Sequence, residues 1–271
     1  METKSQGYLH GYTKEEQNRL YQQARFLETS VFESIDFSKS KRLLEVACGV
    51  GAQTEILLKR FPHIKIDGID ASQEQIHTAE KHLKNSIAKG RVNLKLGDAG
   101  HLPYQDHAFD SSFVCWFLEH VNRPVEILKE IRRVLEPRGI IYCTEVLNAT
   151  FFLHPYSPAT LQYWFHFNDH QWNLGGDPFV GAKLGNYLTD AGFNNVTTEA
   201  KIHHFDNRQP EMRQQMLDYW TQLLLSGTAQ LLNSQKVSEE LVNQMREELD
   251  LLKLATDSIF FYAAMQARAL A

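Results

Sequence analysis

Residues 42–54, Arg-Leu-Leu-Glu-Val-Ala-Cys-Gly-Val-Gly-Ala-Gln-Thr, constrain the fold more than any other stretch of this chain. The apolar run at residues 43–46 is typical of a buried parallel strand. It leads directly into a turn that carries Gly49 and Gly51, and a helical pattern begins near Ala52. Glycine has no Cβ, so a ligand can approach this backbone closely while the N–H groups of the helix start face the same space. The stretch predicts a strand–turn–helix unit that holds a nucleotide-like ligand.

The acidic residue in this stretch indicates which kind of ligand the turn can hold. In the dinucleotide fingerprint G-x-G-x-x-G the glycines cradle a pyrophosphate. Here Glu45 precedes the turn and Ala47 stands where glycine is common. A carboxylate directed into the turn would repel a diphosphate and would suit a cation or an ammonium group. A nicotinamide-dependent Rossmann oxidoreductase is therefore disfavoured, and no Tyr-x-x-x-Lys motif supports it, but it stays open as an alternative.

Three further predicted strands also end in polar residues. Residues 64–70 end in Asp70, about twenty residues after the turn, where a doubly wound fold places an acid on ribose hydroxyls. The strand at residues 92–96 is followed by Asp98, and the strand at residues 109–115 leads to Glu119 and His120. Parallel strands bring their carboxyl ends to one edge of a sheet, so these groups are expected to share one crevice.

Together these motifs resemble the class I S-adenosylmethionine-dependent methyltransferases over residues 40–146. The motifs are LLEVACGVG at 43–51, GID at 68–70, GDA at 97–99 with LP at 102–103, FD at 109–110, LEHV at 118–121 and LEPRG at 135–139. The resemblance implies S-adenosylmethionine as cofactor and S-adenosylhomocysteine as product. It implies that Glu45, Gly49 and Gly51 shape the methionine pocket, that Asp70 receives the ribose hydroxyls, and that Asp98 and Ala99 meet the adenine.

An amphipathic helix is predicted at residues 14–28, with Thr13 as its N-cap. In similar methyltransferases such a helix covers the cofactor. By that resemblance Arg19 and Gln23 are candidates for binding the methionine carboxylate, and Tyr12 closes the pocket beside them. The alternative is that Arg19 is a solvated helix residue. The complete set of cofactor-binding residues expected from the resemblance is Tyr12, Arg19, Gln23, Glu45, Ala47, Gly49, Gly51, Asp70, Ala71, Asp98, Ala99 and Cys115.

The regular alternation of strand and helix predicts an α/β fold, a doubly wound seven-stranded mostly parallel sheet of the Rossmann-like methyltransferase type with a helical cap. Residues 258–266 suit a final strand, which in the family runs antiparallel between strands five and six. We expect a single compact unit with four segments: an N-terminal helical cap at 1–34, the S-adenosylmethionine-binding core at 35–146, an aromatic lid at 147–178, and the remainder of the sheet with further cap helices at 179–271.

Methyl transfer from a sulfonium requires alignment and exclusion of water more than covalent catalysis. Glu119 and His120 are candidates for orienting or deprotonating the acceptor, although the Leu-Glu-His-Val motif also serves helix entry in this superfamily. Some quinone-related members of the family pair a Glu-His with a further acid to bind a divalent ion. By that resemblance no metal site is expected here, because Trp116 stands where the further acid would be needed. The aromatic residues around the lid can simply form its core, and the candidates for the substrate pocket are Trp116, Phe152, Tyr156 and Trp164.

Composition narrows the class of acceptor. The formal net charge of −5 and the scattered lysines and arginines disfavour a nucleic-acid substrate. Neither a long apolar run nor a leader pattern is evident, so a cytoplasmic monomer or homodimer without membrane contact is expected. The function predicted is methyl transfer to N, O, S or C of a small molecule. A non-catalytic regulatory protein that binds S-adenosylmethionine is the other alternative.

Overall fold

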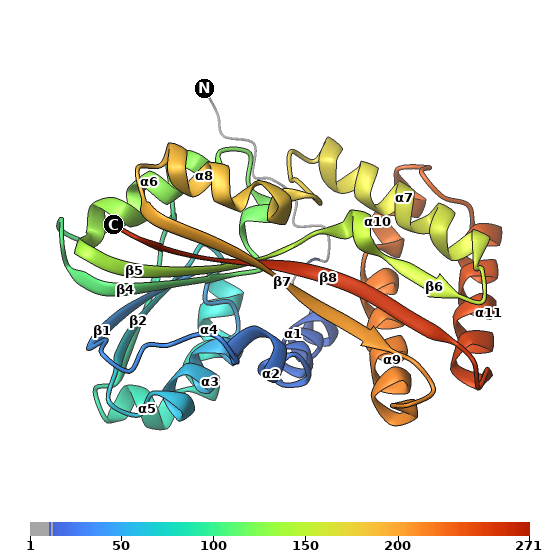
Figure 1. The fold of residues 1–271 in the computed structure, drawn as a ribbon, viewed down its shortest axis with the longest axis horizontal. Coiled ribbons are helices and arrows are strands. Elements are labelled where there is room, and N and C mark those ends of the chain that lie inside the picture. Colours follow the sequence, from blue (N-terminus) through green and yellow to red (C-terminus); the bar gives the residue numbers. More distant parts are fainter. Residues whose placement is uncertain (1–10, 12) are drawn as a thin grey trace.

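Eight strands form one mixed sheet in the computed structural model, which describes residue 11 and residues 13–271 (Figure 1). The strands are β1 Arg42–Val46, β2 Lys65–Asp70, β3 Val92–Leu96, β4 Phe109–Cys115, β5 Leu135–Val146, β6 Phe152–His154, β7 Asn194–Phe205 and β8 Ile259–Leu270. The order is β3-β2-β1-β4-β5-β8-β6, and β7 pairs with β8. Strands β1 to β5 pair in parallel, whereas β8 is antiparallel to β5, β6 and β7.

Helices cover both faces of this sheet, as a doubly wound fold requires. The α-helices are α1 Lys14–Phe26, α2 Glu28–Phe32, α3 Ala52–Arg60, α4 Gln73–His82, α5 Lys84–Ala88, α6 Pro124–Val134, α7 Pro158–Asn173, α8 Leu184–Asp190, α9 Pro210–Ser226, α10 Thr228–Asn233 and α11 Glu239–Leu254. Short 3₁₀ turns are η1 Leu118–His120, η2 Asn148–Thr150 and η3 Val180–Lys183. The α/β, mostly parallel, Rossmann-like fold expected from the sequence is confirmed.

The two faces of β1 enter different cores because strand side chains alternate. Leu43 packs in the cluster that contains Leu57 of α3, whereas Leu44 packs in the cluster that contains Leu128 of α6. Helices α3 to α5 accordingly lie below the sheet in Figure 1, and α6 and α8 lie above it. The same alternation points Glu45 toward α3, where Thr54 is its partner.

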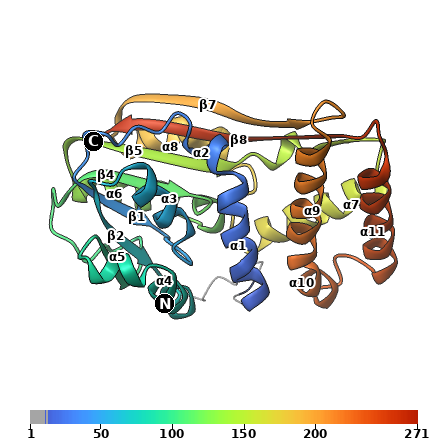
Figure 2. The ribbon, with the colours of Figure 1, turned by 90° about the horizontal axis from the view of Figure 1, so that it is seen from below.

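An outer block surrounds the far ends of β6, β7 and β8, and α7, α9, α10 and α11 form it (Figure 2). Its centre is aromatic. The ring of Trp220 on α9 lies 4.9 Å from Phe151, 5.1 Å from Phe260 and 4.9 Å from Tyr262 between centroids. Strand β8 runs through both the sheet centre and this block, so one strand joins the two parts of the core.

Several element boundaries differ from the sequence expectation. The sheet has an additional strand, β6, whose three residues pair with β8. The sequence pattern of residues 73–89 predicts one helix, whereas the structure has two helices that meet at Leu83, whose buried side chain lies against Gly51. The apolar run at residues 140–146 predicts the fifth strand, but β5 begins earlier, at Leu135, because Leu135 already pairs with Phe109 before a register shift.

Candidate functional site

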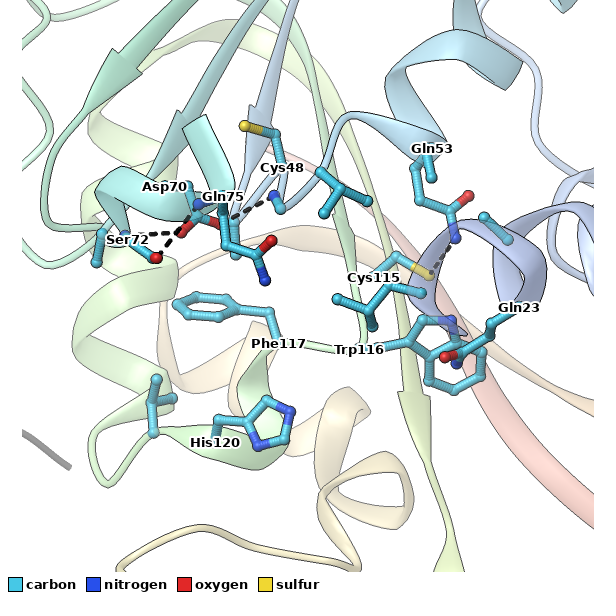
Figure 3. A pocket seen from close by; sticks show the side chains of 18 of the residues that line it. Gln23, Cys48, Gln53, Asp70, Ser72, Gln75, Cys115, Trp116, Phe117 and His120 are labelled. Atoms are coloured by element: carbon cyan, nitrogen blue, oxygen red, sulfur yellow. Dashed lines mark hydrogen bonds between the residues drawn. The ribbon is translucent and has the colours of Figure 1, made fainter. Parts of the chain in front are cut away.

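A cavity of about 300 Å³ opens at the carboxyl ends of β1, β2 and β4 (Figure 3). The turn after β1, the start of α4 and the turn after β4 form its floor and sides. Helix α1 and the end of α7 contribute the remaining wall. The lining residues are Leu20, Gln23, Ala24, Ala47, Cys48, Gly49, Val50, Ala52, Gln53, Asp70, Ala71, Ser72, Gln75, Cys115, Trp116, Phe117, His120, Val121, Gln171, Leu174 and Gly176.

The two glycines of the turn after β1 both have left-handed backbone conformations, but their surroundings differ. Gly49 has φ +53° and Gly51 has φ +77°, both in the left-handed region that favours glycine. A Cβ placed on Gly49 would meet no atom within 4 Å, whereas a Cβ on Gly51 would lie 2.7 Å from Leu83 Cδ1. Gly51 is therefore required for packing against α4. Gly49 instead leaves open space on the side of the cavity.

Asp70 ties the glycine turn to α4. Its Oδ2 accepts a hydrogen bond from the Gly49 N–H at 2.9 Å, and its Oδ1 accepts one from the Ser72 N–H at 2.9 Å. Burial raises the pKa of Asp70, and these backbone hydrogen bonds act in the opposite direction. A carboxylate oxygen accepts more than one hydrogen bond, so Asp70 retains acceptor capacity toward the cavity, where it is drawn in Figure 3.

Glu45 lies beneath the turn and is not among the side chains that line the cavity. It is buried, and the Thr54 hydroxyl donates a 2.6 Å hydrogen bond to its Oε2. Burial raises the pKa of Glu45 to about 8, and the nearby Asp70 adds to the shift. The predicted role of Glu45 in the methionine pocket stays a prediction.

Helix α1 brings Leu20 and Gln23 to the cavity. Thr13 caps the helix by accepting a hydrogen bond from the Glu16 N–H, as the sequence predicted. Arg19 is not a solvated residue: it is 6% exposed, and two of its nitrogens contact the carboxylate of Glu16 at 2.6 and 2.7 Å. A third nitrogen donates to Gln23 Oε1 at 3.0 Å, so Arg19 fixes the side chain that faces the cavity.

Hydrogen bonds to residues of β5 fix the turn after β4. Trp116 adopts φ +55°, an unusual conformation for a large side chain. The backbone N–H of Trp116 donates to the Thr144 carbonyl, and Glu145 Oε1 accepts from the backbone N–H groups of Phe117 and Leu118 at 2.9 and 2.6 Å. Burial raises the pKa of Glu145 to about 8, with a further contribution from Glu119.

Glu119 and His120 follow in this turn. Glu119 is buried and accepts a 2.8 Å hydrogen bond from Gln171 Nε2 on α7, while its other oxygen lies 3.6 Å from His120 Nε2. His120 lines the first cavity, as Figure 3 shows, whereas Glu119 does not line that cavity. The His120 side chain therefore faces the cavity, and the Glu119 carboxylate lies next to its ring.

A second cavity, of about 70 Å³, adjoins the first. The two cavities share Leu20, Gln23, Trp116 and His120 as lining residues. The remaining lining residues of the second cavity are Arg19, Leu27, Glu119, Val146, Asn148, Trp164, Phe167, His203, Met216, Tyr219, Trp220, Leu223 and Tyr262. They come from α1 and the residue that follows it, and from η1, β5, η2, α7, β7, α9 and β8.

Most of the residues predicted from the sequence lie at these two cavities. Those that line the first are Gln23, Ala47, Gly49, Asp70, Ala71, Cys115, Trp116 and His120; Arg19, Glu119 and Trp164 line the second. Outside both linings are Glu45, Gly51, Asp98 and Ala99. Asp98 is exposed and accepts hydrogen bonds from Gly100 and His101. Tyr12 lies outside the described residues.

Phe152 and Tyr156 lie elsewhere. They are exposed by 52% and 76%, and neither lines either of these cavities. Phe152 points outward because β6 alternates, with its neighbour Leu153 buried in the core. Tyr156 occupies the turn between β6 and α7. Their predicted place in the substrate pocket is not supported by these positions.

Sequence reasoning missed several lining residues. Gln53 and Gln75 stand in the first turns of α3 and α4, where the strand–turn–helix pattern could have indicated them. His203, Tyr219 and Tyr262 come from β7, α9 and β8. No local motif marks these three residues, because only the tertiary fold brings them to β4.

Three glutamine side-chain oxygens have no hydrogen-bond partner among the described residues, although they are buried: Gln53 Oε1, Gln75 Oε1 and Gln171 Oε1. All three residues line the first cavity. Buried acceptors are normally satisfied. A ligand with several donors, such as amine and hydroxyl groups, therefore suits this cavity.

Neither a metal nor a membrane is indicated by the part of the chain that the structure describes. Between residues 13 and 271, no group of three or more His, Cys, Asp and Glu side chains is arranged to hold a metal ion. The helices within the same residues all lack the length and apolarity needed to cross a bilayer.

The doubly wound sheet and the cavity at its strand ends define an α/β protein of the kind whose ligand site lies at the carboxyl ends of the strands. Residues 44–143 match the family model of the methyltransferase domain. These residues therefore carry a methyltransferase domain, and the match favours the class I S-adenosylmethionine-dependent methyltransferases over the nicotinamide-dependent oxidoreductases. Members of this class use S-adenosylmethionine.

Known proteins support the same class. An uncharacterised methyltransferase of Schizosaccharomyces pombe is 30% identical over 181 residues, which cover 63% of this chain and 64% of that protein. The demethylmenaquinone methyltransferase of Lactobacillus johnsonii is 35% identical over 108 residues, or 40% of this chain and 44% of that protein. The chain thus spans less than two thirds of the length of these relatives. Among solved structures, the [4+2]-cyclase SpnF has a TM-score of 0.56 at 23% identity, covering 91% of this chain and 82% of that one.

Proposed function

We propose that this chain binds S-adenosylmethionine in the first cavity and transfers its methyl group to a small molecule. The observation that carries the proposal is the open space beside Gly49, next to Asp70 at the end of β2, within the matched domain. A donor-rich ligand with a ribose and an amino group fits the unpartnered acceptors of Gln53 and Gln75. The small-molecule acceptor is supported by the relative that acts on demethylmenaquinone.

Different residues of the first cavity would contact different parts of S-adenosylmethionine. Asp70 accepts hydrogen bonds from the ribose hydroxyls, since it ends β2 beside the cavity. Gly49 leaves room for the ligand, and the Gln23 amide, fixed by Arg19, faces it from α1. Cys115 is a thiol here, because burial raises its pKa well above the usual range.

The bound sulfonium supplies an activated methyl group, and the chain's work is then to orient the acceptor and exclude water. Trp116 and His120 line both cavities, so they stand where donor and acceptor would meet. His120 accepts the acceptor's proton where the acceptor holds one, and Glu119 orients its ring at 3.6 Å. These roles are proposals for Glu119 and His120, as the sequence also suggested.

Calorimetric titration with S-adenosylmethionine, S-adenosylhomocysteine and NAD tests the proposal. We expect the first two ligands to bind, and Asp70→Ala to weaken their binding by about 1–3 kcal/mol through loss of charge-assisted hydrogen bonds. Asp67→Ala is the control: Asp67 lies on the same strand but bonds to Arg42 and Asn93 outside the cavity. Binding of NAD alone, or an unchanged dissociation constant in Asp70→Ala, would contradict the proposal.

A second candidate is a protein that binds S-adenosylmethionine without transferring its methyl group. The similarity to the structure of SpnF favours considering it, since a cyclase has the same fold. Release of S-adenosylhomocysteine over a panel of phenols, thiols and amines separates the two. Tight binding of the cofactor with no turnover across the panel would favour this second candidate.

A further inference from the structure

The second cavity begins where the first one ends. Trp116 and His120 line both, and the second cavity then extends away from β1 and β2 toward α9 and β8. A ligand that occupies the first cavity therefore leaves the second one open to another molecule at the shared residues.

Its walls are aromatic and come from separate elements. Trp164 and Phe167 of α7 are stacked, with centroids 5.3 Å apart and planes at 19°. Trp220 of α9 and Tyr262 of β8 contribute two more rings, 4.9 Å apart, and Met216 and Leu223 complete an apolar surface. Rings placed around a narrow space favour a flat apolar body, which they contact by offset or edge-to-face packing.

The ionic groups of these walls already have partners in the chain. Arg19 is paired with Glu16 through two contacts, and Glu119 accepts from Gln171 while its second oxygen faces His120. An anionic molecule would therefore have to displace Glu16 from Arg19, and a cationic one would have to compete for Glu119. Burying a charge without a partner costs several kcal/mol.

The other titratable groups that line the second cavity are uncharged near pH 7. Burial lowers the pKa of His203 to about 4, and burial raises the pKa of Tyr219 to about 12. The hydroxyl of Tyr262 is occupied by Asn148 Oδ1 at 3.0 Å. These residues add polarity to the second cavity without adding charge.

We infer that the second cavity is the acceptor chamber and that it selects neutral aromatic hydroxyl compounds over charged acceptors of the same size. This inference rests on the proposed function. The hydroxyl lies at the shared end, beside His120, and the ring lies among Trp164, Trp220 and Tyr262. As the oxygen's lone pair forms the new O–CH₃ bond, the C–S bond breaks and its electrons stay on sulfur. The hydroxyl proton passes to His120 and then to water.

Calorimetry on the full chain saturated with S-adenosylhomocysteine tests the inference. The probes are 4-ethylphenol, 4-ethylbenzoate and 4-ethylbenzylammonium, which share one ring and differ in charge. We expect 4-ethylphenol to bind at least about tenfold more tightly than either ion, equivalent to about 1.4 kcal/mol. Equal or tighter binding of an ion would overturn the inference, as would binding of none of the three.

A pair of variants on α9 locates the binding. Leu223 lines the second cavity, so Leu223→Phe should fill it and abolish binding of 4-ethylphenol while leaving the affinity for S-adenosylhomocysteine unchanged. Leu225, two residues away and similarly half-buried, lines neither cavity, and Leu225→Phe is the matched control. Unchanged phenol binding in Leu223→Phe would place the acceptor elsewhere. If the unmodified chain does not bind S-adenosylhomocysteine, that result would instead contradict the proposed function.

Discussion

Two glycines with left-handed backbone conformations allow a test of whether the space beside Gly49 holds the ligand, because alanine adds one methyl group at either position. Gly49 and Gly90 have φ of +53° and +66°, and a Cβ on either would meet no atom within 4 Å. Alanine at either site should therefore lower the free energy of unfolding by a similar amount, about 1–2 kcal/mol, because of backbone strain. Only Gly49 lines the first cavity, so only Gly49→Ala should weaken binding of S-adenosylmethionine, by about tenfold or more.

Chemical denaturation and calorimetric titration of both variants check this prediction. If the two variants lose stability equally and neither loses affinity, the space beside Gly49 does not hold the ligand.

At this scale the sequence predicted residues that belong to short motifs. Asp70 was predicted because it ends a recognisable strand a fixed distance after the glycine turn. Tyr219 and Tyr262 were not, because each is an ordinary aromatic residue in its own segment. Only the pairing of β8 with β5 and the packing of α9 bring them to the cavity. Sequence pattern is local, and the second cavity is made of distant segments.

Helix α1 forms part of the wall of the first cavity, so the stability of this helix should affect affinity. Thr13 caps α1, and Ser238 caps α11 in the same way, by accepting a hydrogen bond from the N–H three residues on. Thr13→Ala and Ser238→Ala should each destabilise the chain by about 1 kcal/mol. Thr13→Ala alone should also lower the affinity for S-adenosylmethionine, because Leu20 and Gln23 on α1 line the cavity.

Hydrogen exchange of the first helical turns and calorimetric titration measure these two effects. A similar loss of affinity in both variants would show that global stability, rather than α1, governs binding.

The elements themselves were largely predictable, since buried strands and amphipathic helices have clear periodicities. The exceptions have tertiary causes. Strand β6 is three residues long, and only its pairing with β8 makes it a strand. The break between α4 and α5 falls at Leu83, which packs against Gly51 of the glycine turn, and helical periodicity does not indicate this contact. Helix α10, at Thr228–Asn233, went unpredicted because six residues are too few for a periodic signal.

The buried carboxyls make the stability of the whole molecule depend on pH. Burial raises the pKa of Glu45 and Glu145 from 4.5 to about 8, so the folded state holds more protons than the unfolded state between these values. Their contribution is fully present below pH 4.5 and is lost as pH rises toward 8, by up to about 1.4 kcal/mol per pH unit for each. Burial lowers the pKa of His203 from 6.5 to about 4, which has the opposite effect between pH 4 and 6.5.

The clearest window is therefore pH 6.5 to 8. Urea unfolding in this window should show falling stability, and Glu45→Gln should reduce the slope by about half, since glutamine keeps an acceptor for Thr54 and cannot titrate. Parallel curves for the two proteins would show that Glu45 is ionised equally in both states.

Strand β8 has a further consequence for how the molecule is made. It pairs with β5 along one edge and with β7 along the other, yet residues 259–270 leave the ribosome after both neighbours. Until they emerge, β5 and β7 each have an edge of unpaired backbone groups, which is the kind of surface on which nascent chains associate wrongly. Completion of the sheet, and with it of the wall that Tyr262 gives to the second cavity, must therefore follow synthesis of this strand rather than accompany synthesis of the matched domain.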